Sequence, residues 1–175
     1  MNNSRFRCMA SLASLVLFLL AACNKADWKE FHSNEGRFTV TMPGDPSQDS
    51  STVKTAIGPV DIHMFHHDEI FLSFLVGYSD FPQRPELIYN TDEMFDGARN
   101  EIVRKENATV KSEQPITVDG CPGRLIILEK DQNLTMKIKM IWQQPRLYQV
   151  VIAANDIRAG STDIDRFMDS FKMTQ

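Results

Sequence analysis

The segment from residue 109 to residue 154 places the strongest constraint on the fold, because four strand-like stretches follow one another in it. In the third stretch, apolar and polar side chains alternate from Leu134 to Met140, which is the two-residue period of a strand with one buried face. Lys137 and Lys139 are therefore expected on a solvent-facing side of the sheet. Turn residues separate the stretches, which predicts consecutive antiparallel strands. The expected strands cover residues 109–118, 124–130, 134–142 and 147–154.

More strands are expected before this segment. Phe38, Val40 and Met42 alternate with threonines, which predicts a half-buried strand. The stretch 71–78 is apolar at almost every position, so we expect a strand that begins at Phe71 and is covered on both faces. Further extended segments are expected at residues 28–31 and 60–67, and the polar stretch 47–55 is expected as an edge strand.

Two helices complete the expected fold. Asn90 and Glu93 approximate a capping box, which predicts a helix start near residue 90. A second helix is expected at residues 162–171. In both helices the apolar side chains recur at helical spacing and should face the sheet: Met94, Phe95, Ala98 and Ile102 in the first, and Ile164, Phe167, Met168 and Phe171 in the second. The sequence thus predicts an α+β domain, an antiparallel sheet with helices packed on its faces.

The first 23 residues have the layout of a secretory signal. Arg5 and Arg7 form a basic start, and an apolar run continues to Leu20. The alternative is a short transmembrane anchor, but the run of about 13 residues is well below the roughly 20 that a spanning helix needs. The ending Leu20-Ala21-Ala22-Cys23 resembles the bacterial lipobox, in which the cysteine receives a diacylglycerol and the segment before it is removed.

This resemblance implies a signal peptide at residues 1–22, a lipid on Cys23, a short tether at 23–27 and one domain at 28–175. The protein would then be anchored to a membrane of the cell envelope. Asn24, rather than aspartate, follows the acceptor cysteine. By resemblance to the sorting rule of bacteria with two membranes, Asn24 implies the outer membrane, facing the periplasm, if the organism has one.

Charge and cysteine content narrow the class of partner. Removal of Arg5 and Arg7 leaves 17 of the 19 basic residues beside 23 acidic ones, a net charge of −6. We therefore expect no nucleic-acid partner.

Lipidation would consume the thiol of Cys23 and leave Cys121 alone, so no internal disulfide is expected. Cys121 lies in Gly120-Cys121-Pro122-Gly123 and is interpreted as a turn residue.

The candidate metal ligands lie in one expected strand and are His63, His66, His67 and Asp68. Histidine and carboxylate side chains are common ligands of transition metals. His63 and His67 would share a face but stand roughly 13 Å apart, too far to hold one ion alone. His66 and Asp68 would share the other face and supply two ligands. The alternative is a polar strand end with exposed histidines.

No arrangement of residues points to catalysis. The serines lack the setting of a nucleophile elbow, and the paired carboxylates at Asp92-Glu93 and Asp163/Asp165 are explained by helix capping. No glycine-rich loop is placed to bind phosphate. We expect no enzymatic activity and no cofactor.

A family resemblance extends over nearly the whole expected domain. The residues that carry it are Trp28, Phe31, Glu35-Gly36-Arg37-Phe38, Met42-Pro43-Gly44, Pro46, Gly77-Tyr78-Ser79, Asp96-Gly97-Ala98-Arg99, Gly120, Pro122-Gly123-Arg124, Arg146-Leu147-Tyr148-Gln149 and the stretch 167–171. They resemble a group of small bacterial envelope lipoproteins. The strand order is similar to that of the PsbP-like family, named for an extrinsic subunit of photosystem II, whose fold is shared with a Ran-binding nuclear-import factor.

The resemblance implies a PsbP-like fold and says little about function, since one fold hosts unrelated activities. It offers no established catalytic residues to transfer to this chain. The expected function is that of a membrane-anchored, non-catalytic binding or assembly module of the bacterial cell envelope, with an envelope protein as its unidentified partner. The alternative is a weak metal- or ligand-binding protein that uses the segment from His63 to His67.

Overall fold

The structure is a computed structural model that describes residues 27–55, 57–131 and 133–174. In this part of the chain, ten strands and two helices follow one another. Their order and bounds are β1 (Trp28–Ser33), β2 (Phe38–Pro43), β3 (Ser47–Thr55), β4 (Gly58–Glu69), β5 (Leu72–Asp80), α1 (Thr91–Glu106), β6 (Thr109–Val118), β7 (Cys121–Lys130), β8 (Leu134–Gln143), β9 (Arg146–Asn155), α2 (Thr162–Ser170) and β10 (Lys172–Met173).

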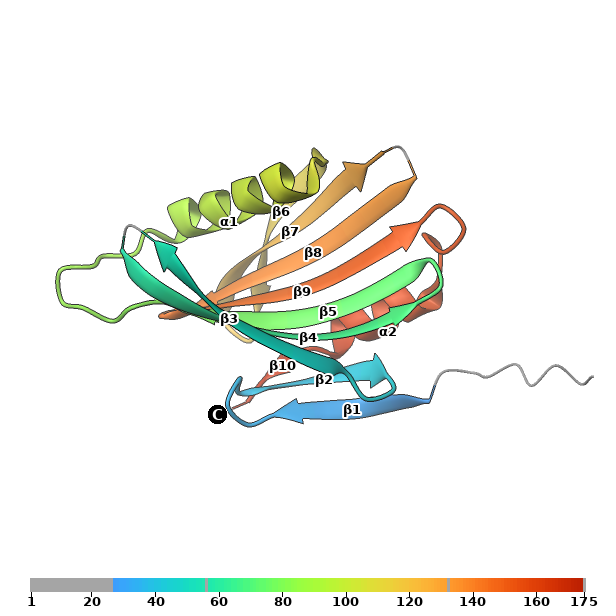
Figure 1. The fold of residues 1–175 in the computed structure, drawn as a ribbon, viewed down its shortest axis with the longest axis horizontal. Helices are drawn as coiled ribbons and strands as arrows, with labels where there is room; N and C mark the ends of the chain where they lie inside the picture. Colours follow the sequence, from blue (N-terminus) through green and yellow to red (C-terminus); the bar gives the residue numbers. More distant parts are fainter. Residues whose placement is uncertain (1–26, 56, 132, 175) are drawn as a thin grey trace, which may run out of the picture.

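The strands form two antiparallel sheets. The large sheet has seven strands in the order β3-β4-β5-β9-β8-β7-β6, and the small sheet has the order β1-β2-β10. Helix α1 covers one face of the large sheet, whereas α2 and the small sheet lie against the other (Figure 1). The expected α+β class with an antiparallel sheet and helices on its faces is therefore confirmed. The separate small sheet and its last strand β10 were not predicted from the sequence.

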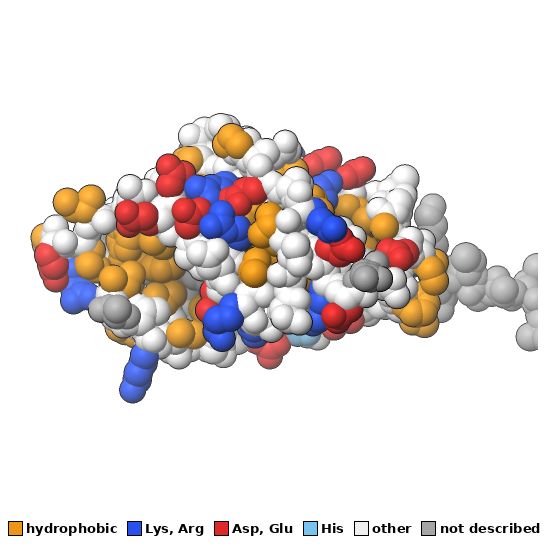
Figure 2. Space-filling model, turned by 90° about the horizontal axis from the view of Figure 1, so that it is seen from above, with side chains coloured by type: hydrophobic (Ala, Val, Ile, Leu, Met, Phe, Trp, Pro, Cys, Tyr) orange, Lys and Arg blue, Asp and Glu red, His pale blue; other side chains and the backbone are white. Residues whose placement is uncertain are grey.

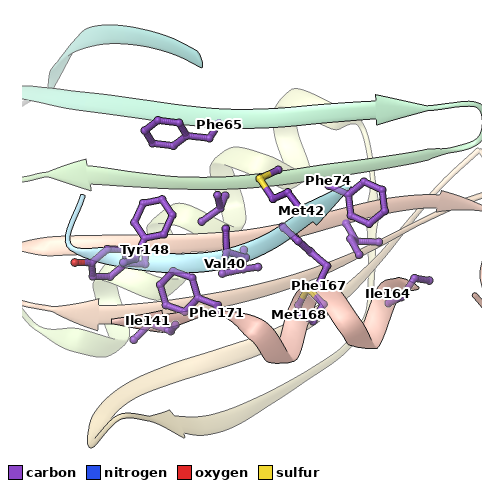
Figure 3. Packing of buried hydrophobic residues seen from close by; sticks show 14 of the residues in the cluster. Val40, Met42, Phe65, Phe74, Ile141, Tyr148, Ile164, Phe167, Met168 and Phe171 are labelled. Carbon is purple, nitrogen blue, oxygen red and sulfur yellow. The ribbon is translucent and has the colours of Figure 1, made fainter. Parts of the chain in front are cut away.

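The larger core lies between the large sheet, the small sheet and α2 (Figure 3). Phe74 of β5 meets Phe167 of α2 with ring centroids 5.3 Å apart, and Phe38 of β2 stacks on Phe171 at 5.6 Å. Ile164, Phe167, Met168 and Phe171 are all buried, as the helical spacing predicted. The second helix thus joins the two sheets through a single apolar stripe.

The second core lies between α1 and strands β7 and β8. Phe95 of α1 is 2% exposed and packs with Ile126, Leu128, Ile138 and Met140 of the sheet. The helix begins after Asn90, whose side chain accepts hydrogen bonds from the backbone N–H groups of Asp92 and Glu93. The predicted helix start and apolar face are therefore confirmed.

The face of β8 that carries Lys137 and Lys139 is not a free solvent-facing side. Lys139 Nζ donates to the carbonyl oxygen of Met168 at 2.5 Å, and Lys137 pairs with Asp165 at 3.2 Å. Burial beneath α2 lowers the pKa of Lys139, and Asp169 acts in the opposite direction. The alternation correctly predicted the strand, but it did not show that α2 covers this face. The long lysine side chains can lie under the helix because they reach polar groups of α2.

The prediction for the start of β5 was also wrong. Phe71 is 56% exposed and lies with Ile70 in the two-residue turn that joins β4 to β5. The strand begins at Leu72. In its first half only one face is buried, since Ser73 and Leu75 on the other face are half-buried. Helix α1 packs over β7 and β8, so it leaves this part of β5 without a second layer.

Candidate functional site

A concave surface lies at the end of the large sheet where β5 and β8 finish. The loop from Phe81 to Tyr89 and the β8–β9 turn enclose a volume of about 500 Å³, and they are held together by a hydrogen bond from the Phe81 N–H to the Pro145 carbonyl oxygen at 3.0 Å. Figure 2 shows hydrophobic side chains gathered at this end of the molecule, on the left. The lining residues are Gln83, Arg84, Pro85, Leu87, Tyr89, Gln144 and Pro145.

An aromatic cluster forms the base of this loop. The rings of Phe81, Tyr89 and Trp142 meet edge to face, with Phe81 and Tyr89 each 5.5 Å from Trp142. The Tyr89 hydroxyl donates to the Pro82 carbonyl oxygen at 2.5 Å. Ile88, in contrast, is 94% exposed. The loop is therefore anchored from beneath and presents an apolar side chain that the domain itself does not use.

Arg146 connects three segments beside the loop. It makes a two-pronged ion pair with Asp80, at 2.6 and 2.7 Å, and donates to the Glu35 carbonyl oxygen at 2.8 Å. Its guanidinium lies 4.1 Å from the centre of the Tyr78 ring. Burial raises the pKa of Tyr78 to about 12, and the nearby Glu35 carboxylate acts in the same direction. These contacts hold the β1–β2 turn against the large sheet.

The β1–β2 turn requires a glycine at residue 36. A Cβ atom there would lie 2.6 Å from a ring carbon of Phe38 and 2.6 Å from the Ser33 hydroxyl. The Gly36 carbonyl oxygen accepts a hydrogen bond from the Tyr148 hydroxyl at 2.9 Å. Glu35-Gly36 and Arg146-Leu147-Tyr148 are thus parts of one structural joint, which explains their residue types without a ligand.

A second ion cluster joins α1 to β6 and β7. Arg124 pairs with Asp96 at 2.5 Å, with Glu113 at 2.6 Å and with Asp92 at 2.9 Å. Hydrogen bonding to Arg124 lowers the pKa of Asp96. Arg99 also pairs with Glu113, at 2.7 Å. Spacing along the sequence gave no sign of this cluster, because its members are brought together only by the packing of α1 on the sheet.

The predicted metal ligands are spread over both faces of β4. His63 stacks on Tyr78 with ring centroids 4.6 Å apart, whereas His66 Nδ1 lies 3.5 Å from Asp49 of the neighbouring strand β3. His67 borders Gly44, and Asp68 is paired with Ser73 in the strand register. Across the described ranges no three His, Cys, Asp or Glu side chains are grouped closely enough to hold a metal ion. Metal binding here stays a prediction, supported by a single His66–Asp49 pair.

The two cysteines that would remain after cleavage differ in position. Cys23, the predicted lipidation site, lies outside the described residues. Cys121 is the first residue of β7, so its interpretation as a turn residue was wrong; the turn consists of Asp119 and Gly120, both with positive φ. Neither helix of the described chain is both long and apolar enough to span a membrane.

Comparison with protein-family models and with curated protein sequences found no match. Among solved structures, the solution structure of cyanobacterial PsbP (CyanoP) from Synechocystis sp. PCC 6803 is similar, with a TM-score of 0.54 and 13% sequence identity. The match covers 87% of this chain and 95% of CyanoP. The chain has a PsbP-like fold.

The PsbP-like fold confirms the fold that the resemblance in sequence implied. The crystal structure of PA94, a protein of unknown function from Pseudomonas aeruginosa, matches at a TM-score of 0.39 and 9% identity, over 79% of this chain and 90% of that one. This second likeness is too weak to define a fold. At such identities the likeness to CyanoP concerns the path of the chain, and not its activity.

Proposed function

We propose that the protein is a lipid-anchored, non-catalytic binding or assembly module of the bacterial cell envelope. The observation that carries this proposal is the position of the first described residue, Asp27, relative to the concave loop surface. Asp27 follows the lipobox residue Cys23 by four residues, which span about 14 Å at most. A lipid on Cys23 would therefore hold the end of the domain that carries Asp27 close to the membrane.

Contacts identify the end that the tether would hold. The Asp27 carbonyl oxygen accepts a hydrogen bond from the Gly44 N–H at 2.9 Å, and the Trp28 ring meets Phe74 at 5.5 Å. Phe74 lies near the start of β5, whereas the concave loop surface begins after Asp80 at the end of that strand. The six residues that follow Phe74, up to Asp80, correspond to about 20 Å of strand. The loop surface would thus be presented away from the membrane.

The character of that distant end favours binding over catalysis. It combines a hollow of about 500 Å³ with the exposed Ile88 side chain and the aromatic cluster of Phe81, Tyr89 and Trp142 beneath the loop. A partner that covered Ile88 would remove its apolar surface from water, which favours association. Arg146 and Asp80, beside the hollow, are paired with each other and hold the β1–β2 turn, and Arg84, which lines the hollow, pairs with Glu86 at 3.6 Å.

Mass spectrometry of the protein purified from bacterial membranes tests the anchor. We expect a mature chain that starts at Cys23 and carries a diacylglycerol on its thiol. A Cys23→Ser variant should lack this mass and keep residues 1–22, because the acceptor thiol is gone. A wild-type chain with an unmodified Cys23, or with its signal segment retained, would contradict the proposal.

A further inference from the structure

Phe71 holds a backbone conformation that is unfavourable for an aromatic residue. Its φ is +67°, in the left-handed region where glycine and asparagine are the usual residues. The ring is 56% exposed, so it is not there to fill the core. In the two-residue turn between β6 and β7, both residues have positive φ, and they are aspartate and glycine, Asp119 and Gly120, which favour that conformation. The side chain of Phe71 therefore requires an explanation outside the domain.

Two further apolar side chains lie at the same end of the molecule. Ile70 precedes Phe71 in the turn, and Ile157 lies in the loop between β9 and α2; both are 76% exposed. Asn155 joins the two segments, since its N–H donates to the Phe71 carbonyl oxygen at 3.2 Å and its side chain accepts from the Ile157 N–H at 3.1 Å. We call Ile70, Phe71 and Ile157 the apolar tip.

The apolar tip lies at the end where the described chain begins. Gly44 borders both Asp27 and the ring of His67. From His67, the chain continues through Asp68 and Glu69, the last residues of β4, to Ile70 in the turn, about 10 Å at the rise of an extended strand. Figure 1 shows the β4–β5 turn, the β9–α2 loop and the start of β1 at the same end of the molecule, and Figure 2 shows hydrophobic side chains there.

The segment between Cys23 and Asp27 is long enough for a lipid on Cys23 and the apolar tip to meet one membrane surface. The four residues from Cys23 to Asp27 span at most about 14 Å, and Ile70 lies about 10 Å along the chain from His67, which borders the same Gly44 as Asp27. A lipid inserted at Cys23 and the apolar tip can therefore reach the same membrane surface. Among the ionised groups just behind the tip, Arg158 lies 3.5 Å from Glu69 and 3.2 Å from Asp163, so these three charges are paired. Asp156, next to Ile157, is exposed, and insertion of the tip has to leave its carboxylate in water.

We infer that the apolar tip inserts into the surface of the membrane that holds the lipid anchor, so that the domain is oriented and not only tethered. This inference rests on the proposed lipidation of Cys23. The occupant of the tip is the bilayer, because a tether of this length brings that surface within reach. The chain from Cys23 to Gln175 has a net charge of −6, which disfavours contact with anionic lipids. The expected lipid at the tip is therefore zwitterionic.

Spin labelling of the full lipoprotein in phosphatidylcholine vesicles tests the inference. The background carries Cys121→Ser, and a nitroxide is attached at Phe71→Cys or, as a matched control, at Ile88→Cys on the opposite end. We expect the label at residue 71 to collide more with oxygen than with a water-soluble nickel chelate, as labels in a bilayer do. The label at residue 88 should show the reverse order.

The mass of each labelled protein is measured in the same sample, which separates two kinds of failure. A lipid on Cys23 together with a water-exposed label at residue 71 would overturn the inference and leave the proposed function standing. An N-terminus without lipid would overturn the proposed function, and the inference with it. A bilayer signal at both positions would show that the domain has no fixed orientation, and it would also overturn the inference.

Discussion

Phe71 illustrates how a single residue can oppose the local preference of its turn. An aromatic residue with φ of +67° is strained, and glycine would adopt this conformation without a Cβ contact. We expect Phe71→Gly to leave the free energy of unfolding unchanged or to raise it by up to about 1 kcal/mol. Phe74→Ala, which removes a fully buried ring, should lower it by about 3–5 kcal/mol. Urea denaturation of both variants measures this; a large loss in Phe71→Gly would mean that the ring stabilises the domain.

Tyr78 gives the domain a dependence on alkaline pH. Burial raises the pKa of Tyr78 to about 12, above its usual value near 10. Between these values the folded protein binds more protons than the unfolded chain, so stability should fall as the pH rises from 10 to 12. Urea midpoints measured across this range should show a shallower decline in Tyr78→Phe, which has no proton to lose. Equal slopes in both proteins would contradict a raised pKa.

At the scale of elements, α2 is the part that closes the larger core. Phe167 is fully buried between α2 and β5, so Phe167→Ala should lower the free energy of unfolding by about 3–5 kcal/mol. Lys172→Ala, just beyond the helix, changes an exposed side chain and should cost less than about 0.5 kcal/mol. Urea denaturation compares the two. Equal midpoints would mean that α2 does not hold the sheets together.

The helices and strands that have a regular apolar pattern could be predicted from the sequence, but the elements they pack against could not. Alternation and capping located α1, α2 and the central strands because these signals depend on neighbouring residues. Strand β10 has only two residues and exists because β2 lies beside it. The covering of Lys139 likewise depends on where α2 packs, and the exposure of Phe71 depends on where the β4–β5 turn falls. An apolar stretch alone does not contain that information.

The whole molecule has two different ends, and we expect only one of them to meet a protein partner. A photo-crosslinking amino acid at Ile88, an exposed position in the loop that borders the concave surface, should give one discrete adduct in intact cells. The same residue at Val53, an exposed position on the edge strand β3, should give none. Immunoblots of irradiated cells measure this. Discrete adducts at Val53 alone would place the partner on the sheet edge and contradict the proposal.

The candidate site was the part that sequence reasoning found least well. The histidines of β4 drew attention because they cluster in sequence, and the strand places His63 and His66 on opposite faces, as the two-residue period predicted. The loop surface is made by residues 81–89 and by Gln144 and Pro145, which are far apart along the chain. The only local sign of it is Pro82 and Pro85 after β5, residues that favour the end of a strand and give no hint of a hollow.

The pairing of β10 with β2 has a consequence for the way the domain is completed. Lys172 and Met173 pair with Thr39 and Phe38, and the Thr174 N–H donates to the Arg37 carbonyl oxygen at 2.9 Å (Figure 1). The hairpin β1–β2 is made early during synthesis, but its outer strand β10 is made more than a hundred residues later. A chain that emerges with its N-terminus first, from a ribosome or a secretion channel, therefore closes the small sheet only after residues 171–174 have been released.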